Sequence, residues 1–299
     1  MIYCKKELRL RTTGGLHSMY IKDHLALQGN AAMEDRIGFG PDYLFVIDGA
    51  SGLDKVHLTD EASDAAWLAI RIGEFLEMNL PYPSFELSDL MKAIAQALRQ
   101  EYDNLSFSYQ VAADYPSAGL AIVRRRYNQL EYFGLGDCTA VFRLTDGTFD
   151  LQREEALAAL DQTAISEMVR QAEEHHCTVL EARPYIQDVL VENRNLRNKE
   201  GGYWIFDPTG IGIPHCRYFS RPINEVASVT LMTDGFAQLA DTFTEADGFE
   251  DLHQRCLKEG LAPLADRLFA LQEEDDQCNR YPRFKMRDDT CAVTAIITE

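Results

Sequence analysis

The stretch "FVIDGASG" at residues 45–52 is an apolar run that ends in Asp-Gly, and "TLMTDGFAQL" at residues 230–239 is built in the same way. A single Asp-Gly usually marks a turn, because glycine tolerates positive φ and aspartate readily hydrogen-bonds to nearby backbone. Two strand-like runs that both end in a carboxylate suggest instead that something binds the two acids together.

Other acids lie at the edges of apolar runs: Glu34 and Asp35 in "MEDRIGF", Asp137 in "GLGDCTAVF", and Asp288 and Asp289 in "RDDTCAV". An acid at the end of a buried strand is held by the sheet, and several from different strands could meet in one crevice. Such a cluster would repel itself and would bind protons or a cation. Magnesium and manganese suit carboxylate oxygens. The pattern therefore indicates a divalent-cation site, although each Asp-Gly taken alone could still be a turn.

Composition limits the class of protein. The 299 residues include 46% hydrophobic side chains, enough for a sizeable core, and 29 Lys and Arg against 48 Asp and Glu give a net charge of −19. Such an acidic surface repels nucleic acid and anionic membranes, so we expect neither as a partner. No apolar run has the length of a signal peptide or a membrane span. The seven cysteines are scattered and form no CxxC, which predicts reduced thiols in the cytoplasm.

The order of apolar patterns predicts the fold class. Strands are expected at 24–29 and 43–49, followed by helices at 61–80, capped by Thr59 or Asp60, and 88–102. Three antiparallel strands should fill 117–149, with connections at 127–129 and 134–137. A helix or pair is expected at 151–176, a strand pair in "GYWIFDPTG" and "HCRYFS", a strand at 226–235, helices at 248–272 and a last strand from Thr290. Helices grouped between blocks of antiparallel strands indicate an α+β layered fold with two packed sheets. We expect one domain over residues 1–299.

The ordered acidic motifs resemble those of the protein phosphatase 2C family, the metal-dependent Ser/Thr phosphatases. The resemblance covers nearly the whole chain. It implies a four-layer α/β/β/α sandwich of two antiparallel β-sheets flanked by helices, with a variable flap-like segment around 151–200. The matching motifs are Glu34-Asp35, Asp48-Gly49, "PSAGLAIV" at 116–123, Gly136-Asp137, Asp234-Gly235 and Asp288-Asp289.

The resemblance also implies an active site. Two Mn²⁺ or Mg²⁺ ions would be held by Asp48, the Gly49 carbonyl, Asp234 and Asp288. Glu34 would contribute through water, and Asp137 matches the position of a weaker third ion. A water bridging the two ions would lose its proton near neutral pH and attack the phosphorus of phospho-Ser or phospho-Thr in a protein substrate.

The sequence departs from the family pattern before the Glu-Asp pair. Family members usually carry an arginine there that grips the substrate phosphate, whereas this chain has Asn30, Ala31 and Ala32. Arg36 and Arg287 flank metal motifs and could replace it, although a surface ion pair is the favoured interpretation of each.

Gln238 stands where relatives often have another acid of the third-ion site, and Ala50 stands where eukaryotic relatives have a histidine. Two alternatives therefore stay open beside a protein phosphatase. One is a weakly active or inactive module that binds or senses, and the other is a phosphatase of a small phosphorylated metabolite. The sequence does not indicate an oligomeric state.

Overall fold

The computed structural model describes residues 17–50, 57–109 and 115–298, and within these ranges the strands form two five-stranded antiparallel sheets. The first sheet has the order β1-β10-β9-β6-β7 and the second the order β2-β3-β4-β5-β8. The strands are β1 (Ser18–Leu27), β2 (Asp35–Gly40), β3 (Tyr43–Ala50), β4 (Ser117–Arg126), β5 (Gln129–Leu135), β6 (Thr139–Leu144), β7 (Phe149–Gln152), β8 (Arg217–Pro222), β9 (Val226–Met232) and β10 (Thr290–Thr298).

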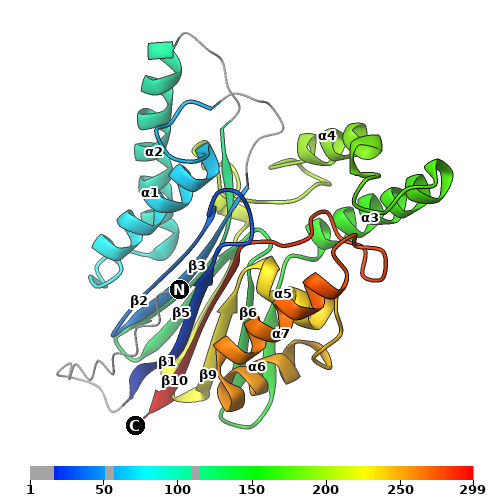
Figure 1. Cartoon of the computed structure of the whole chain (residues 1–299). Coiled ribbons are helices and arrows are strands. Elements are labelled where there is room, and N and C mark those ends of the chain that lie inside the picture. The colour runs from blue at the N-terminus through cyan, green and yellow to red at the C-terminus, as the bar shows by residue number, and fades with distance from the viewer. Residues whose placement is uncertain (1–16, 51–56, 110–114, 299) are drawn as a thin grey trace.

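Helices form the outer layers of this sandwich (Figure 1). Helices α1 (Asp64–Asn79) and α2 (Leu87–Tyr109) pack on the second sheet. Helices α5 (Asp234–Asp241), α6 (Gly248–Glu259) and α7 (Leu261–Glu274) pack on the first. The expected four-layer α/β/β/α arrangement is confirmed.

Strand β3 shows why two packed sheets form. Its side chains alternate between the two faces of the sheet: Phe45 and Ile47 pack against α1 and α2, whereas Leu44 and Val46 enter the core between the sheets. Because both faces are covered, the strand is an almost continuous apolar run, and it stays apolar until Asp48.

A third group of helices lies to one side of the sandwich (Figure 1). It consists of α3 (Glu155–His175), the short 3₁₀ helix η1 (Arg183–Ile186) and α4 (Gln187–Asn195). These helices share a small core that includes Cys278 and packs against Phe284, both from the segment before β10. This group falls within the segment expected to resemble a flap, and its core joins it to the chain that leads into Asp288.

Two expected pairings were wrong. "GYWIFDPTG" does not pair with "HCRYFS": β8 pairs with β5, while the Phe206 backbone exchanges hydrogen bonds of 2.8 and 3.1 Å with Ala118. The chain from Gly134 to Asp137 is not a hairpin turn, because β5 and β6 belong to different sheets. Both errors concern long-range pairing, which local periodicity cannot show.

Two local details also differ from expectation. Helix α1 is capped by Ser63, whose Oγ accepts a hydrogen bond of 3.0 Å from the Ala66 amide, and not by Thr59 or Asp60. Helix α5, which begins at Asp234, was not expected; the apolar run was extended through Gly235 as a strand.

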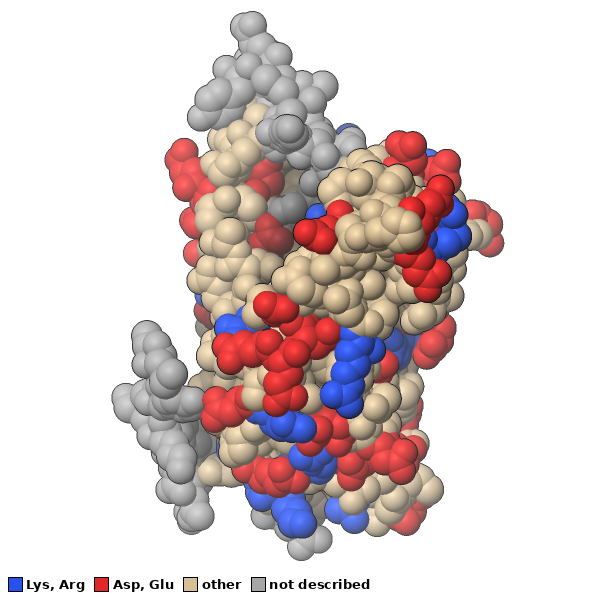
Figure 2. All heavy atoms as spheres, turned by 45° about the vertical axis from the view of Figure 1, so that its right-hand side comes forward, with Lys and Arg blue, Asp and Glu red and all other residues tan. Residues whose placement is uncertain are grey.

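The surface is acidic with basic side chains interspersed, as the face in Figure 2 shows. In the described part of the chain, no helix is long and apolar enough to cross a membrane. Six of the cysteines are free, and Cys4 lies outside the described residues.

Candidate metal centre

Strands β2 and β3 supply the first two acids of the site. Asp35 and Asp48 are directly opposite each other in the β2–β3 register, so their side chains leave the same face of the sheet. Asp35 is only 8% exposed, and its Oδ2 is buried without a hydrogen-bond partner. Loss of hydration and repulsion from neighbouring carboxylates raise the pKa of both groups well above the usual range. The two strands thus concentrate negative charge at one place.

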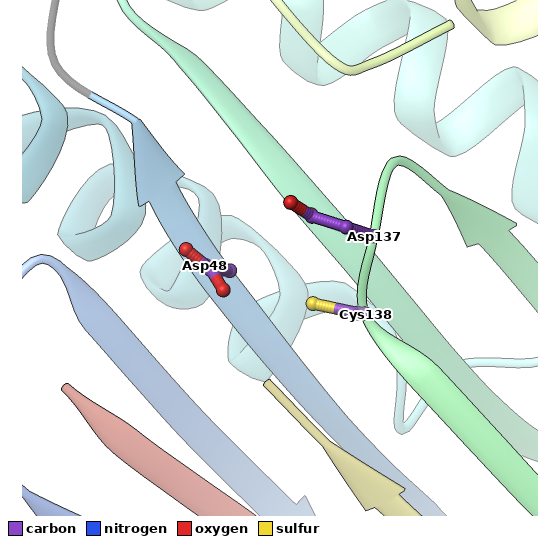
Figure 3. A group of neighbouring side chains, drawn as sticks. All are labelled: Asp48, Asp137 and Cys138. Atoms are coloured by element: carbon purple, nitrogen blue, oxygen red, sulfur yellow. The ribbon is translucent and has the colours of Figure 1, made fainter. Parts of the chain in front are cut away.

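The connection between β5 and β6 adds Asp137 and Cys138. Figure 3 shows both side chains extending from this connection toward Asp48 on β3. Ligand atoms of the three residues lie within 4.8 Å of one another. Asp137 fits here because Gly119, opposite Asp48 on β4, has no side chain: a Cβ would lie 2.3 Å from Asp137 Oδ1. The small-residue start of β4 therefore leaves the space that an acid fills.

Asp234 enters the site from the junction of β9 and α5. Its backbone nitrogen lies 3.4 Å from Asp48 Oδ2, which ties the two Asp-Gly motifs together across the sandwich. The Asp234 side chain reaches solvent, yet the surrounding protein removes part of its hydration, and Asp288 and Asp137 repel its charge. Both effects raise the pKa of Asp234 well above the usual range.

The adjacent acids before β10 have different partners. Asp289 is 1% exposed and accepts hydrogen bonds from the backbone amides of Gly29 (2.8 Å), Asn30 (3.1 Å) and Glu34 (2.7 Å). It therefore fixes the loop between β1 and β2. Asp288 accepts hydrogen bonds from the side chains of Asn30 (2.8 Å) and Lys285 (2.7 Å), and its charge acts on Asp48 and Asp234.

Gly49 allows the end of β3 to approach the backbone at Glu34 closely. Its amide donates a 3.1 Å hydrogen bond to the Glu34 carbonyl, and a Cβ at this position would lie 2.5 Å from that oxygen. The carboxylate of Glu34 in turn accepts a hydrogen bond from Ser63, the cap of α1. Only glycine allows this approach, and the helix cap orients the neighbouring acid.

The residues fit a hard divalent cation. Carboxylate oxygens from separate elements converge, and two of them, Asp35 Oδ2 and Asp137 Oδ1, are buried without a hydrogen-bond partner. Buried charges of one sign need a proton or a cation, and oxygen ligands favour Mg²⁺ or Mn²⁺. Within the described ranges, the group of ligand atoms that all lie within 4.8 Å of one another consists of Asp48, Asp137 and Cys138. The charges of Asp234 and Asp288 act on Asp48 and raise its pKa.

Three side chains considered from the sequence have partners elsewhere. The Arg36 side chain reaches α1, where its Nη2 lies 3.6 Å from Glu77. Arg287 pairs with Glu273 on α7. Gln238 accepts a 3.1 Å hydrogen bond from Gln272. These contacts match the ion-pair interpretation of both arginines, and Arg36 as a phosphate ligand stays a prediction that the contacts do not favour.

Three residues of the site were missed from sequence: Lys285, Cys138 and Ser63. Asp35 was identified as part of the Glu34-Asp35 pair, without a role as a ligand. Cys138 adjoins Asp137, so proximity in sequence could have indicated it. Lys285 stands three residues before Asp288 in a segment without regular structure, and no pattern there predicts its direction.

The fold agrees with the comparisons. The family model for protein phosphatase 2C matches residues 28–269. The serine/threonine phosphatase PstP/Ppp of Mycobacterium tuberculosis is 15% identical with a TM-score of 0.54, covering 94% of this chain and 100% of that one. Stp1 of Staphylococcus aureus is 13% identical with a TM-score of 0.55, covering 98% and 100%. The PstP catalytic domain in complex with two manganese ions is 17% identical with a TM-score of 0.53, covering 95% and 100%. No curated protein sequence matches the chain.

The chain therefore belongs to the protein phosphatase 2C family. It is a metal-dependent protein phosphatase, and its substrates are phosphoproteins.

Proposed function

We propose that the enzyme hydrolyses phospho-Ser and phospho-Thr at a centre for two Mn²⁺ or Mg²⁺ ions. Asp48, the Gly49 carbonyl, Asp234 and Asp288 would hold the ions, and Glu34 would act through water. The observation that carries this proposal is the convergence of acids from β2, β3, the β5–β6 connection, the start of α5 and the segment before β10, with two buried oxygens left unpaired. Bound ions supply a water nucleophile near neutral pH and neutralise charge on the phosphoryl oxygens.

The chain itself positions these groups. Asp289 fixes the loop that carries Glu34, and Ser63 orients the Glu34 carboxylate. Asp35, buried directly opposite Asp48, adds a second carboxylate beside it, which favours cations at the centre. Asp137 would hold the weaker third ion; the bond between Gln238 and Gln272 supports low occupancy there, because this amide is engaged outside the centre.

Substrate selection would reside in the flap-like segment, as part of one functional unit over residues 1–299. Arg194 on α4 donates a 3.1 Å hydrogen bond to the carbonyl of Ala50, the last residue of β3. The flap-like segment thus contacts the strand that carries Asp48, which supports a role in substrate selection. The free cysteines support a cytoplasmic location for the enzyme.

A substrate panel tests this proposal. Initial rates with Mn²⁺ would be measured on phospho-Ser, phospho-Thr and phospho-Tyr peptides and on small phosphorylated metabolites. We expect the phospho-Ser and phospho-Thr peptides to be the best substrates. Faster turnover of the metabolites would contradict the protein substrate, and Mn²⁺ binding without any turnover would indicate a binding module that keeps the fold.

A further inference from the structure

The basic side chains around the acidic centre differ in what they are paired with. Arg217 and Arg153 carry positive charge close to Asp137, but each is paired with an acid outside the centre. Arg217 Nη1 lies 3.0 Å from Glu154, and Arg153 Nη2 lies 2.9 Å from Asp241. Their charges are therefore largely compensated before any ligand arrives.

Lys285 is paired with a proposed metal ligand itself. Its Nζ lies 2.7 Å from Asp288 Oδ1, and its positive charge also acts on Asp234 and Asp48. The side chain is 44% exposed, so a ligand from solvent can reach it. An ammonium group has three N–H donors, and the bond to Asp288 uses one of them.

Charge balance shows what the remaining donors can bind. Asp288 would share its single negative charge between a metal ion and Lys285, and Asp234 and Asp48, which also act on Lys285, would share theirs with the ions. Lys285 would then keep positive charge that these carboxylates do not fully compensate. A phosphate monoester dianion placed at the centre supplies the compensating negative charge. Lysine is a common phosphate ligand that acts as a point charge.

We propose that Lys285 binds the phosphate group of the substrate. The inference rests on the proposed metal centre and assigns to Lys285 the contact for which this chain has no arginine at residues 30–32, just before Glu34. It places the phosphate-binding ammonium group on the segment before β10. That segment also supplies Cys278 to the small core of the flap-like helices, which packs against Phe284.

A purely positioning role for Lys285 makes opposite predictions. If Lys285 only held Asp288 in place, its removal would weaken metal binding and leave phosphate affinity at a given metal occupancy unchanged. If it binds phosphate, its removal weakens phosphate binding. Metal binding then stays equal or becomes tighter, because a positive charge beside a cation site opposes the cation.

The test compares Lys285→Met, Lys285→Gln and Lys285→Arg with Lys92→Met as the matched control. Lys92 forms the same i,i+3 ion pair, 3.0 Å from Asp89, on the exposed side of α2. The probes are orthophosphate, as a competitive inhibitor of aryl phosphate hydrolysis and by calorimetry on the Mn²⁺-loaded full chain, and Mn²⁺ alone by calorimetry.

We expect orthophosphate to bind Lys285→Met and Lys285→Gln about 10- to 100-fold more weakly, the scale of one hydrogen bond to a charged group. Lys285→Arg should recover most of the affinity, and Lys92→Met should match the wild type. Unchanged orthophosphate affinity, or a loss that follows a loss of Mn²⁺ affinity, would overturn the inference. A wild type that binds Mn²⁺ and orthophosphate without turnover would contradict the proposed function instead, and the calorimetric comparison would still decide the role of Lys285.

Discussion

Asp35 and Asp48 face each other across β2 and β3, with both carboxylates on one face of the sheet. Like charges directly opposite each other destabilise an antiparallel pair, and burial adds to the cost. Burial is the main cause of the raised pKa of both groups; repulsion from Asp234 adds to it for both, and repulsion from Asp35 adds to it for Asp48. The folded chain therefore keeps a repulsive pair that a bound cation would relieve, and this links stability to metal binding.

Replacing Asp48 with Asn should have opposite effects with and without metal. In chelator the variant should melt higher than the wild type, by about 2–4 °C for each kcal/mol of repulsion removed. With Mn²⁺ at a hundredfold excess over Kd the wild type should gain about 2.7 kcal/mol, and the variant should gain far less. Thermal melts in chelator and in Mn²⁺ measure both effects. Asp60→Asn, at an exposed position, is the control; the idea fails if Asp48→Asn lowers the melting temperature in chelator.

Cys138 should make the centre sensitive to soft metal ions. Its buried sulfur lies within 4.8 Å of oxygens of Asp48 and Asp137, and thiolates favour soft ions whereas carboxylates suit Mn²⁺. We expect Cd²⁺ to inhibit the wild type, and Cys138→Ser to weaken that inhibition at least about tenfold, the scale at which altered metal contacts change affinity. Cys216→Ser, whose thiol lies outside this group, is the control. Equal Cd²⁺ inhibition of both variants would count against a role for the sulfur.

The buried ion pair between Arg124 and Glu131 should be a sensitive point for stability. Arg124 Nη2 lies 2.6 Å from Glu131 Oε2, and the two side chains are 0% and 3% exposed. Glu131→Ala leaves a buried positive charge without its partner, which costs about 3–5 kcal/mol. The double variant Arg124→Leu, Glu131→Leu should cost less. Urea unfolding measures both, and a double variant that loses more than Glu131→Ala would refute this explanation.

His253 should make the fold weaker in mild acid. Burial lowers the pKa of His253 from 6.5 to about 4, and its ring is hydrogen-bonded to Ser228 and Thr230 at 2.8 Å each. Between about pH 6.5 and 4 the unfolded chain binds a proton that the folded chain does not, so stability falls as the pH falls. The loss attributable to this group is about 3 kcal/mol across that window.

The measurement for His253 is the free energy of unfolding at several pH values for the wild type and His253→Asn. The difference between the two isolates the histidine from the carboxylates of the metal centre, whose raised pKa values act in the opposite direction. We expect the wild type to lose more stability than the variant on going from pH 7 to pH 5. Parallel pH profiles would show that His253 does not titrate as described.

Much of the fold could be predicted because its signals are local. The apolar runs before Asp48 and Asp234 end where β3 and β9 bring their acids to the site, and the order of motifs predicted the four layers. The pairing of β8 with β5 could not be predicted, because the two strands are far apart in the sequence. The residue pattern of a strand does not indicate which other strand it pairs with. Helix α5 was missed because Asp234 and Gly235, which begin it, were assigned to the end of the preceding strand.

The acids that meet in the structure could be named from the sequence, but their supporting contacts could not. Asp48, Asp137, Asp234 and Asp288 were identified from motifs, but the separate partners of Asp288 and Asp289 depend on backbone amides of a distant loop. The position of Lys285 depends on a segment without periodicity. Such contacts follow from tertiary packing, which composition and spacing do not encode.

The most direct test of the central claim is the Mn²⁺ dependence of turnover on a phospho-Thr peptide, with Asp48→Ala and Asp234→Ala beside the wild type and Asp60→Asn. We predict that wild-type turnover requires Mn²⁺, saturates with it and is abolished by chelator. Either alanine variant should lose at least about a hundredfold in kcat, the scale of one preorganised electrostatic contact, whereas Asp60→Asn should keep it. Turnover that persists in chelator, or that survives in both alanine variants, would contradict the metal centre described here.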